Sequence, residues 1–211
     1  MRAQERISFY SHLIGVVAAI VGTFLLLYIS KGCMAKTIIS TIYGISVIFL
    51  FTASSLYHAF KQNENEISFW RKMDHFAIFI MIAGTYTPIC YIYLIGWWKW
   101  SIIIILWALV IGGFFFKFFY LNAPRYLYTA IYLIMGWVGI VPIKQFLITM
   151  PKNVLFFLFL GGVSYTTGAV FYILKKPQIK PGFGFHEIFH FFILVGGFCH
   201  YIAVFISIAM N

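Results

Sequence analysis

Residues 185–210 read FHEIFHFFILVGGFCHYIAVFISIAM, and Glu187 is the only charged residue among them. A transmembrane helix needs about 20 mostly apolar residues, and this run is longer than that. His186 and His190 are four residues apart, so in a helix their imidazoles lie on one face, one above the other. The stretch therefore predicts a membrane helix whose N-terminal turns carry half of a metal site.

The composition of the whole chain agrees with a protein built from such helices. Of its 211 residues, 63% are hydrophobic and 9% are charged. In a soluble domain, about a quarter of the residues are charged. The 25 Phe, 14 Tyr and 6 Trp residues suit lipid-facing and interfacial positions. We expect an all-α integral membrane protein.

Seven apolar runs are long enough to cross a bilayer, and short connections between them carry most of the charge. We expect a single transmembrane domain over residues 1–211, a seven-helix bundle with a cytoplasmic N-terminus and the C-terminus outside. The expected spans are residues 7–29, 36–60, 73–95, 100–119, 125–148, 153–174 and 185–210. The first run is too long for the apolar part of a signal peptide and lacks a convincing cleavage site, so we expect it to stay as the first span.

The orientation follows from Lys and Arg, which accumulate on the cytoplasmic side of membrane proteins. With the N-terminus inside, ten of the 15 basic residues face the cytoplasm and five face outward. The inside set is Arg2, Arg6, Lys61, Arg71, Lys72, Lys117, Arg125, Lys175, Lys176 and Lys180, and the outside set is Lys31, Lys36, Lys99, Lys144 and Lys152. Contacts with anionic headgroups explain the net charge of +10, and we expect no nucleic-acid partner.

This topology brings ionisable residues from several spans to one leaflet. His58 lies near the cytoplasmic end of the second span, Asp74 begins the third, and His186 and His190 begin the seventh. His12 lies one to two turns into the first span, on the same side. Ionisable groups in membrane helices are costly and usually face the bundle interior with partners. We therefore expect a shared polar site at this depth.

Three imidazoles in that site form a candidate zinc centre. His58, His186 and His190 would supply three nitrogen ligands to Zn²⁺. Three protein ligands with an open fourth position are typical of catalytic zinc, and water in that position becomes a nucleophile near neutral pH. Asp74 is the candidate catalytic base. Ser54, one turn deeper than His58, is the candidate hydroxyl that orients the reacting groups or stabilises an oxyanion.

The remaining histidines have a simpler interpretation, since a single His near a membrane surface is usually an interfacial residue. We apply it to His12, His75 and His200. His200 lies ten residues beyond His190, about 15 Å along a helix, so it cannot share a metal with His186. It could line a cavity.

The turn at His186 also matches the pattern His-Glu-x-x-His. In soluble metalloproteases this pattern supplies two zinc ligands and a general-base Glu. Glu187 lies close to the end of its span, and we expect it at the membrane rim without a catalytic role.

Three motifs taken together resemble the progestin and adipoQ receptor (PAQR) superfamily. They are Ser54-x-x-x-His58 closing the second span, Asp74 opening the third, and His186-x-x-x-His190 opening the seventh. The short tails are similar to the bacterial branch, the hemolysin III family. Two further matches to that branch are Ser11-His12-x-x-Gly15 and Met135-Gly136-Trp137.

The resemblance implies a seven-helix bundle in the bacterial cell membrane with zinc near the cytoplasmic leaflet. It implies zinc ligation by His58, His186 and His190, contact of Asp74 with the zinc-bound water, and Ser54 close by. The superfamily resembles ceramidases and other lipid amide hydrolases, which implies a membrane lipid substrate. Bacterial members are linked to lipid homeostasis, and the name hemolysin refers to cytolytic behaviour.

The leading hypothesis is a zinc-dependent membrane hydrolase that acts on a lipid amide or ester. The alternative is a non-enzymatic sensor or regulator of membrane state in which zinc clamps three helices. A pore-forming cytolysin fits less well, because the chain has no polar exterior for a water-soluble state. An intramembrane protease would use Glu187 as its base.

Overall fold

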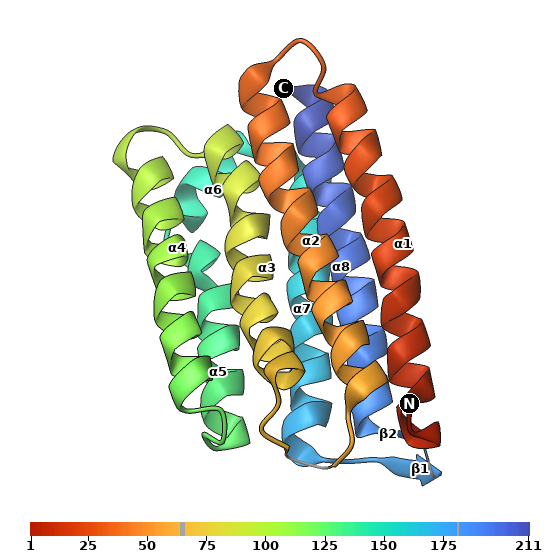
Figure 1. Cartoon of the computed structure of the whole chain (residues 1–211). Helices are drawn as coiled ribbons and strands as arrows, with labels where there is room; N and C mark the ends of the chain where they lie inside the picture. The colour runs from red at the N-terminus through yellow and green to blue at the C-terminus, as the bar shows by residue number, and fades with distance from the viewer. Residues whose placement is uncertain (64–65, 181) are drawn as a thin grey trace.

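The computed structural model describes residues 1–63, 66–180 and 182–211. They form a bundle of long helices with a two-stranded antiparallel hairpin at one end (Figure 1). The long helices are α1 (Arg6–Ile29), α2 (Met34–Phe60), α3 (Phe69–Tyr93), α4 (Gly96–Phe119), α7 (Lys152–Leu174) and α8 (Phe185–Met210). The shorter elements are η1 (Ala3–Glu5), α5 (Arg125–Gly136), η2 (Val138–Ile140), α6 (Ile143–Thr149), β1 (Gln178–Lys180) and β2 (Phe183–Gly184).

Six helices of the described chain are long and apolar enough to cross a membrane. The segments Arg125–Ile140 and Ile143–Thr149 form a bent pair with an angle of 53°, and counting them as one span gives seven. The two termini lie at opposite ends of the bundle, which requires an odd number of crossings (Figure 1). The chain is thus an all-α, multi-span membrane protein.

The fifth span is broken, whereas a continuous helix was expected at residues 125–148. Helix α5 ends at Gly136, a 3₁₀ turn follows, and α6 begins after Pro142. Proline lacks an N–H group and its ring clashes with the preceding turn. The Tyr86 hydroxyl of α3 replaces some of the backbone hydrogen bonds that the break removes. It donates to the Gly136 carbonyl at 2.7 Å and accepts from the Gly139 N–H at 2.8 Å. Irregular backbone at membrane depth needs such partners within the protein.

The helices enclose an interior. Helix α1 packs on α2 and α8, α2 packs on α3, α7 packs on α8, and α5 contacts α3 and α7. Gly161 and Gly196 allow α7 and α8 to approach closely, because a Cβ on Gly161 would lie 3.1 Å from the Gly196 carbonyl oxygen. Large apolar side chains are exposed on the outer faces, as a lipid-facing surface requires. Examples are Phe24, Ile45, Ile111, Phe159 and Phe198.

Candidate metal centre

Three imidazoles converge where α2 ends and α8 begins. His58 lies in the last turn of α2, and His186 and His190 lie in the first two turns of α8. The Nε2 atom of His186 is 3.4 Å from Nε2 of His58 and 3.2 Å from Nε2 of His190. His58 and His190 are buried and His186 is partly buried. The three histidines form a group that could hold a metal ion, and they come from two helices rather than three.

The spacing of these nitrogens fits a metal. Zinc–nitrogen bonds of about 2.0–2.1 Å in a tetrahedral site separate the ligand nitrogens by about 3.3 Å. Two of the three separations, 3.2 and 3.4 Å, agree with that value, and all three ligand atoms lie within 4.8 Å of one another. A set of three imidazoles suits zinc, copper, iron or nickel, while magnesium and calcium prefer oxygen ligands.

A carboxylate absent from the sequence-based site contacts His58. Glu5, at the end of η1, is buried, and its Oε2 lies 2.7 Å from Nδ1 of His58. Its Oε1 lies 2.8 Å from Nζ of Lys61. A carboxylate that accepts the Nδ1 proton fixes the tautomer and leaves the Nε2 lone pair for a metal. Sequence reasoning could have found Glu5, because it is one of only five acidic residues and precedes the first span on the same side as His58.

His12 was expected at the membrane interface, but it lies inside the bundle. Its side chain is 3% exposed, and its ring stacks on His190 with centroids 3.9 Å apart. Within the described residues, neither ring nitrogen of His12 has a hydrogen-bond partner, and Nδ1 of His190 has none either. These nitrogens are therefore available to a polar ligand or to water.

His75 and His200 are also interior residues, in contrast to the interfacial positions expected. His75 is buried, and its Nδ1 lies 3.3 Å from Nζ of Lys117. His200 lines the cavity described below, as its spacing from His190 allows, and its Nε2 lies 3.2 Å from the Leu158 carbonyl oxygen.

Glu187 lies in the first turn of α8, close to the end of the span as expected, but its side chain is buried within the protein. Its Oε2 accepts a hydrogen bond from the Gly184 N–H at 2.7 Å, and its Oε1 accepts one from the Ser8 hydroxyl at 3.1 Å. The first bond satisfies a free N–H at the start of α8, and a negative charge there is favourable. Glu187 therefore caps α8 and joins it to α1.

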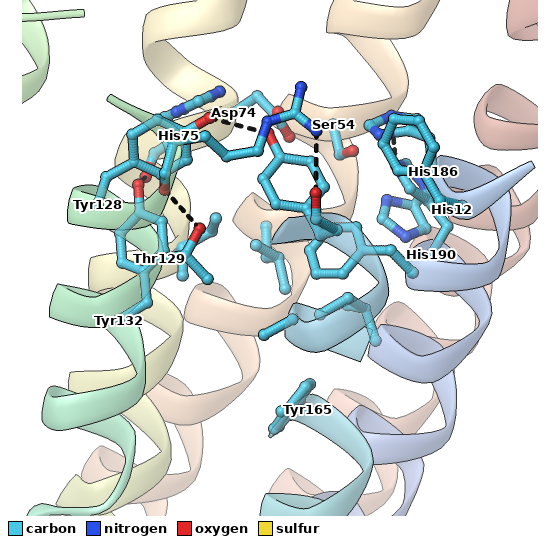
Figure 2. A pocket seen from close by; sticks show the side chains of 18 of the residues that line it. His12, Ser54, Asp74, His75, Tyr128, Thr129, Tyr132, Tyr165, His186 and His190 are labelled. Carbon is cyan, nitrogen blue, oxygen red and sulfur yellow. Dashed lines mark hydrogen bonds between the residues drawn. The ribbon is translucent and has the colours of Figure 1, made fainter. Parts of the chain in front are cut away.

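Two of the three histidines, His186 and His190, line a cavity of about 860 Å³, and His58 contacts His186 from outside that lining. In Figure 2, His12, His186 and His190 lie on one side, Asp74, His75, Tyr128 and Tyr132 lie on the other, and Ser54 lies between them. Apolar side chains line other parts of the cavity. They include Leu50, Ile78, Met81, Ile82, Leu133 and Ile193. The cavity thus offers both polar and apolar surface, as an amphiphilic ligand requires.

Asp74 and Ser54 lie in this cavity as neighbours of the histidines. Asp74 is partly buried near the start of α3. Its carboxylate lies within electrostatic range of the His58 imidazole and close to the Ser54 hydroxyl. The ligand group found in the described part of the chain contains the three histidines alone. The structure therefore brings the candidate base and hydroxyl beside the group without making them part of it.

A buried lysine lies behind the opposite wall of the cavity. Lys117 lies at the same end of the bundle as the N-terminus, but its side chain is fully buried instead of reaching the headgroups. Its Nζ lies 3.3 Å from Nδ1 of His75 and 3.9 Å from the ring centroid of Tyr128. An aromatic face stabilises a desolvated ammonium group. This wall is therefore basic and aromatic.

Known proteins resemble the chain over most of its length. Residues 1–201 match the family model described as "Haemolysin-III related". The chain is 35% identical over 188 residues to the hemolysin-3 homolog of Bacillus subtilis (strain 168), which covers 88% of this chain and 85% of the relative. Hemolysin-3 of Bacillus cereus is also 35% identical over 188 residues, covering 88% and 83%. The monocyte to macrophage differentiation factor of Homo sapiens is 29% identical over 205 residues, covering 92% and 80%.

These matches agree with the helical architecture. The family match includes η1 with Glu5, the end of α2 with His58, and the start of α8 with its two histidines. The Bacillus relatives support a bacterial origin, and the apolar helices make the chain a multi-pass membrane protein. The chain belongs to the hemolysin III family, the bacterial branch of the progestin and adipoQ receptor superfamily.

Proposed function

We propose that the chain is a zinc-dependent membrane hydrolase that cleaves an amide or ester bond of a membrane lipid and acts in lipid homeostasis. The observation that supports this most is a three-histidine group, two of whose members, His186 and His190, line an amphiphilic cavity. Three imidazoles leave a tetrahedral metal one further position, the pattern of catalytic zinc sites.

His58, His186 and His190 would hold the zinc ion through Nε2. Zinc bound there would polarise a carbonyl group and make a water molecule nucleophilic near neutral pH. Glu5 accepts the Nδ1 proton of His58 and keeps that ring in its ligating orientation.

Asp74 is the proposed general base. It lies within electrostatic range of His58 and lines the same cavity, which supports a role in taking a proton from the attacking water and returning it to the leaving amine or alcohol. Ser54 interacts with the Asp74 carboxylate and would orient it. The apolar lining would hold the acyl chain, and the volume of about 860 Å³ lies within the range of small-molecule sites.

The test separates metal binding from hydrolysis. Purified wild type, Asp74→Asn and His58→Ala are analysed for zinc and assayed with a panel of lipid amides and esters. Asp74→Asn should keep its zinc and lose at least ~100-fold in hydrolysis, because general acid–base catalysis contributes 10²–10⁴-fold. His58→Ala should lose both. Full zinc occupancy in the wild type without cleavage of any lipid in the panel would contradict the proposal.

A regulatory role without catalysis is the second candidate. Its support is that the histidines join the end of α2 to the start of α8, while Glu5 ties the N-terminal turn to the same point. A metal there would clamp these segments. Under this alternative, Asp74→Asn preserves the biological response as long as zinc stays bound.

A further inference from the structure

The cavity wall opposite the three-histidine group carries an excess of positive charge. Arg71, near the start of α3, and Arg125, the first residue of α5, line the cavity. Lys117 is buried behind His75, which also lines it. In the part of the chain that the structure describes, no carboxylate lies within ion-pair distance of these three basic groups. Asp74, which lies near Arg71 and Lys117, adds a single negative charge to this wall.

Neutral acceptors hold the two arginines in place. Nη1 of Arg71 donates to the Glu66 carbonyl oxygen at 3.0 Å and to Oδ1 of Asn122 at 3.4 Å. Nη1 of Arg125 donates to the Tyr172 carbonyl oxygen at 2.9 Å, and its guanidinium carbon lies 4.3 Å from the centroid of the Tyr172 ring.

Both guanidinium groups keep donors for a ligand. Each has five N–H groups, and the remaining ones have no acceptor within the described residues. The planar guanidinium fork matches the oxygens of phosphate in a bidentate arrangement. Arg71 is 8% exposed, so its contacts are largely shielded from water, where a charge-assisted hydrogen bond is stronger.

Unpaired cations at membrane depth are costly and are normally balanced by a partner. We propose that Arg71 and Arg125 form a subsite for the phosphate group of a phospholipid headgroup. The adjoining apolar lining would receive the acyl chain, which favours a lipid phosphate over free phosphate. This inference concerns binding and stands whether or not the lipid is hydrolysed.

The experiment measures binding to the purified full-length chain by calorimetry in detergent. Lysophosphatidic acid should bind at least ~10-fold more tightly than a monoacylglycerol of the same chain length, the factor expected from one charge-assisted bond. Arg125→Gln and Arg71→Gln should each remove most of this preference. Arg6→Gln is the matched control, because Arg6 lies at the same end of the bundle, is exposed and does not line the cavity. It should leave the preference unchanged.

Three results would overturn the proposal. They are equal binding of the phosphorylated and neutral lipids, unchanged preference in both arginine variants, and binding of inorganic phosphate or a fatty acid as tight as that of the lipid phosphate. Arg125→Lys, which keeps the charge, should retain part of the binding and controls for misfolding. Asp74→Asn separates this proposal from the proposed hydrolysis, because it should lower hydrolysis at least ~100-fold and yet tighten phosphate binding by removing the nearby negative charge.

Discussion

The two walls of the cavity bury polar groups at the same end of the bundle in different ways. The histidine wall is the side of the cavity that carries His186 and His190, with His58 against it. Its imidazoles adjoin an ion pair, because Glu5 contacts both His58 and Lys61. On the basic wall, Arg71 and Arg125 are held by neutral oxygen acceptors and an aromatic ring. The first wall has its own counter-charge, and the second has more cations than acids.

This difference indicates how each wall would use a ligand. The Glu5–His58–Lys61 network satisfies its own charges and can hold His58 rigid before a ligand arrives, which suits the fixed geometry of a metal site. A wall with surplus donors is completed by the ligand itself. We therefore expect variants of the histidine wall to change metal binding, and variants of Arg71 and Arg125 on the basic wall to change the affinity for anions while metal binding stays the same.

The largest effect should come from His190→Ala, which breaks the histidine wall. Removing one of three ligands should lower zinc occupancy of the purified protein to near zero. His200→Ala is the matched control, because His200 lies on the same helix and lines the same cavity but lies outside the three-histidine group. It should keep the occupancy of the wild type. Elemental analysis after dialysis against a weak chelator measures both, and equal zinc in the two variants would refute the assigned ligands.

The fold could be predicted mainly from the length of the apolar runs. The structure has helices over residues 6–29, 34–60, 69–93, 96–119, 152–174 and 185–210, close to the expected spans. The break in the fifth span could not be predicted from Pro142 alone. It depends on the hydroxyl of Tyr86 on another helix, which supplies hydrogen bonds to the interrupted backbone.

Part of the site could be predicted, because sequence spacing and topology give the depth of a residue in the membrane. The spacing of His186 and His190 gives a common face, and the topology gives the depth of His58 and Asp74. The rotation of a helix about its axis is harder to predict, because its lipid-facing and interior faces are both apolar. The inward positions of His12 and Lys117 follow from that rotation. These residues were therefore assigned to the membrane surface, where the structure does not place them.

A smaller effect should come from Glu5→Gln, which removes the counter-charge of the histidine wall and preserves its shape. Loss of a carboxylate that orients a metal-binding His typically weakens metal affinity 10–100-fold. We expect a shift of that size in a competition titration with a zinc chelator, with the protein still folded. Glu66→Gln is the control, because Glu66 accepts backbone N–H bonds in the connection before α3 and does not touch the histidines. An unchanged affinity in Glu5→Gln would show that the contact with His58 is not part of the metal site.

The smallest effect on metal binding should come from Glu187→Gln. The amide oxygen of Gln can still accept from the Gly184 N–H or the Ser8 hydroxyl, so the cap of α8 is weakened and not lost. We expect zinc affinity within ~3-fold of wild type and a lower thermal midpoint, since losing part of a cap destabilises by about 1 kcal/mol. Ser8→Ala, which removes one partner of Glu187, should lower the midpoint similarly. If Glu187→Gln instead abolished hydrolysis at full zinc occupancy and unchanged stability, Glu187 would be the base. Asp74 would then belong only to the basic wall.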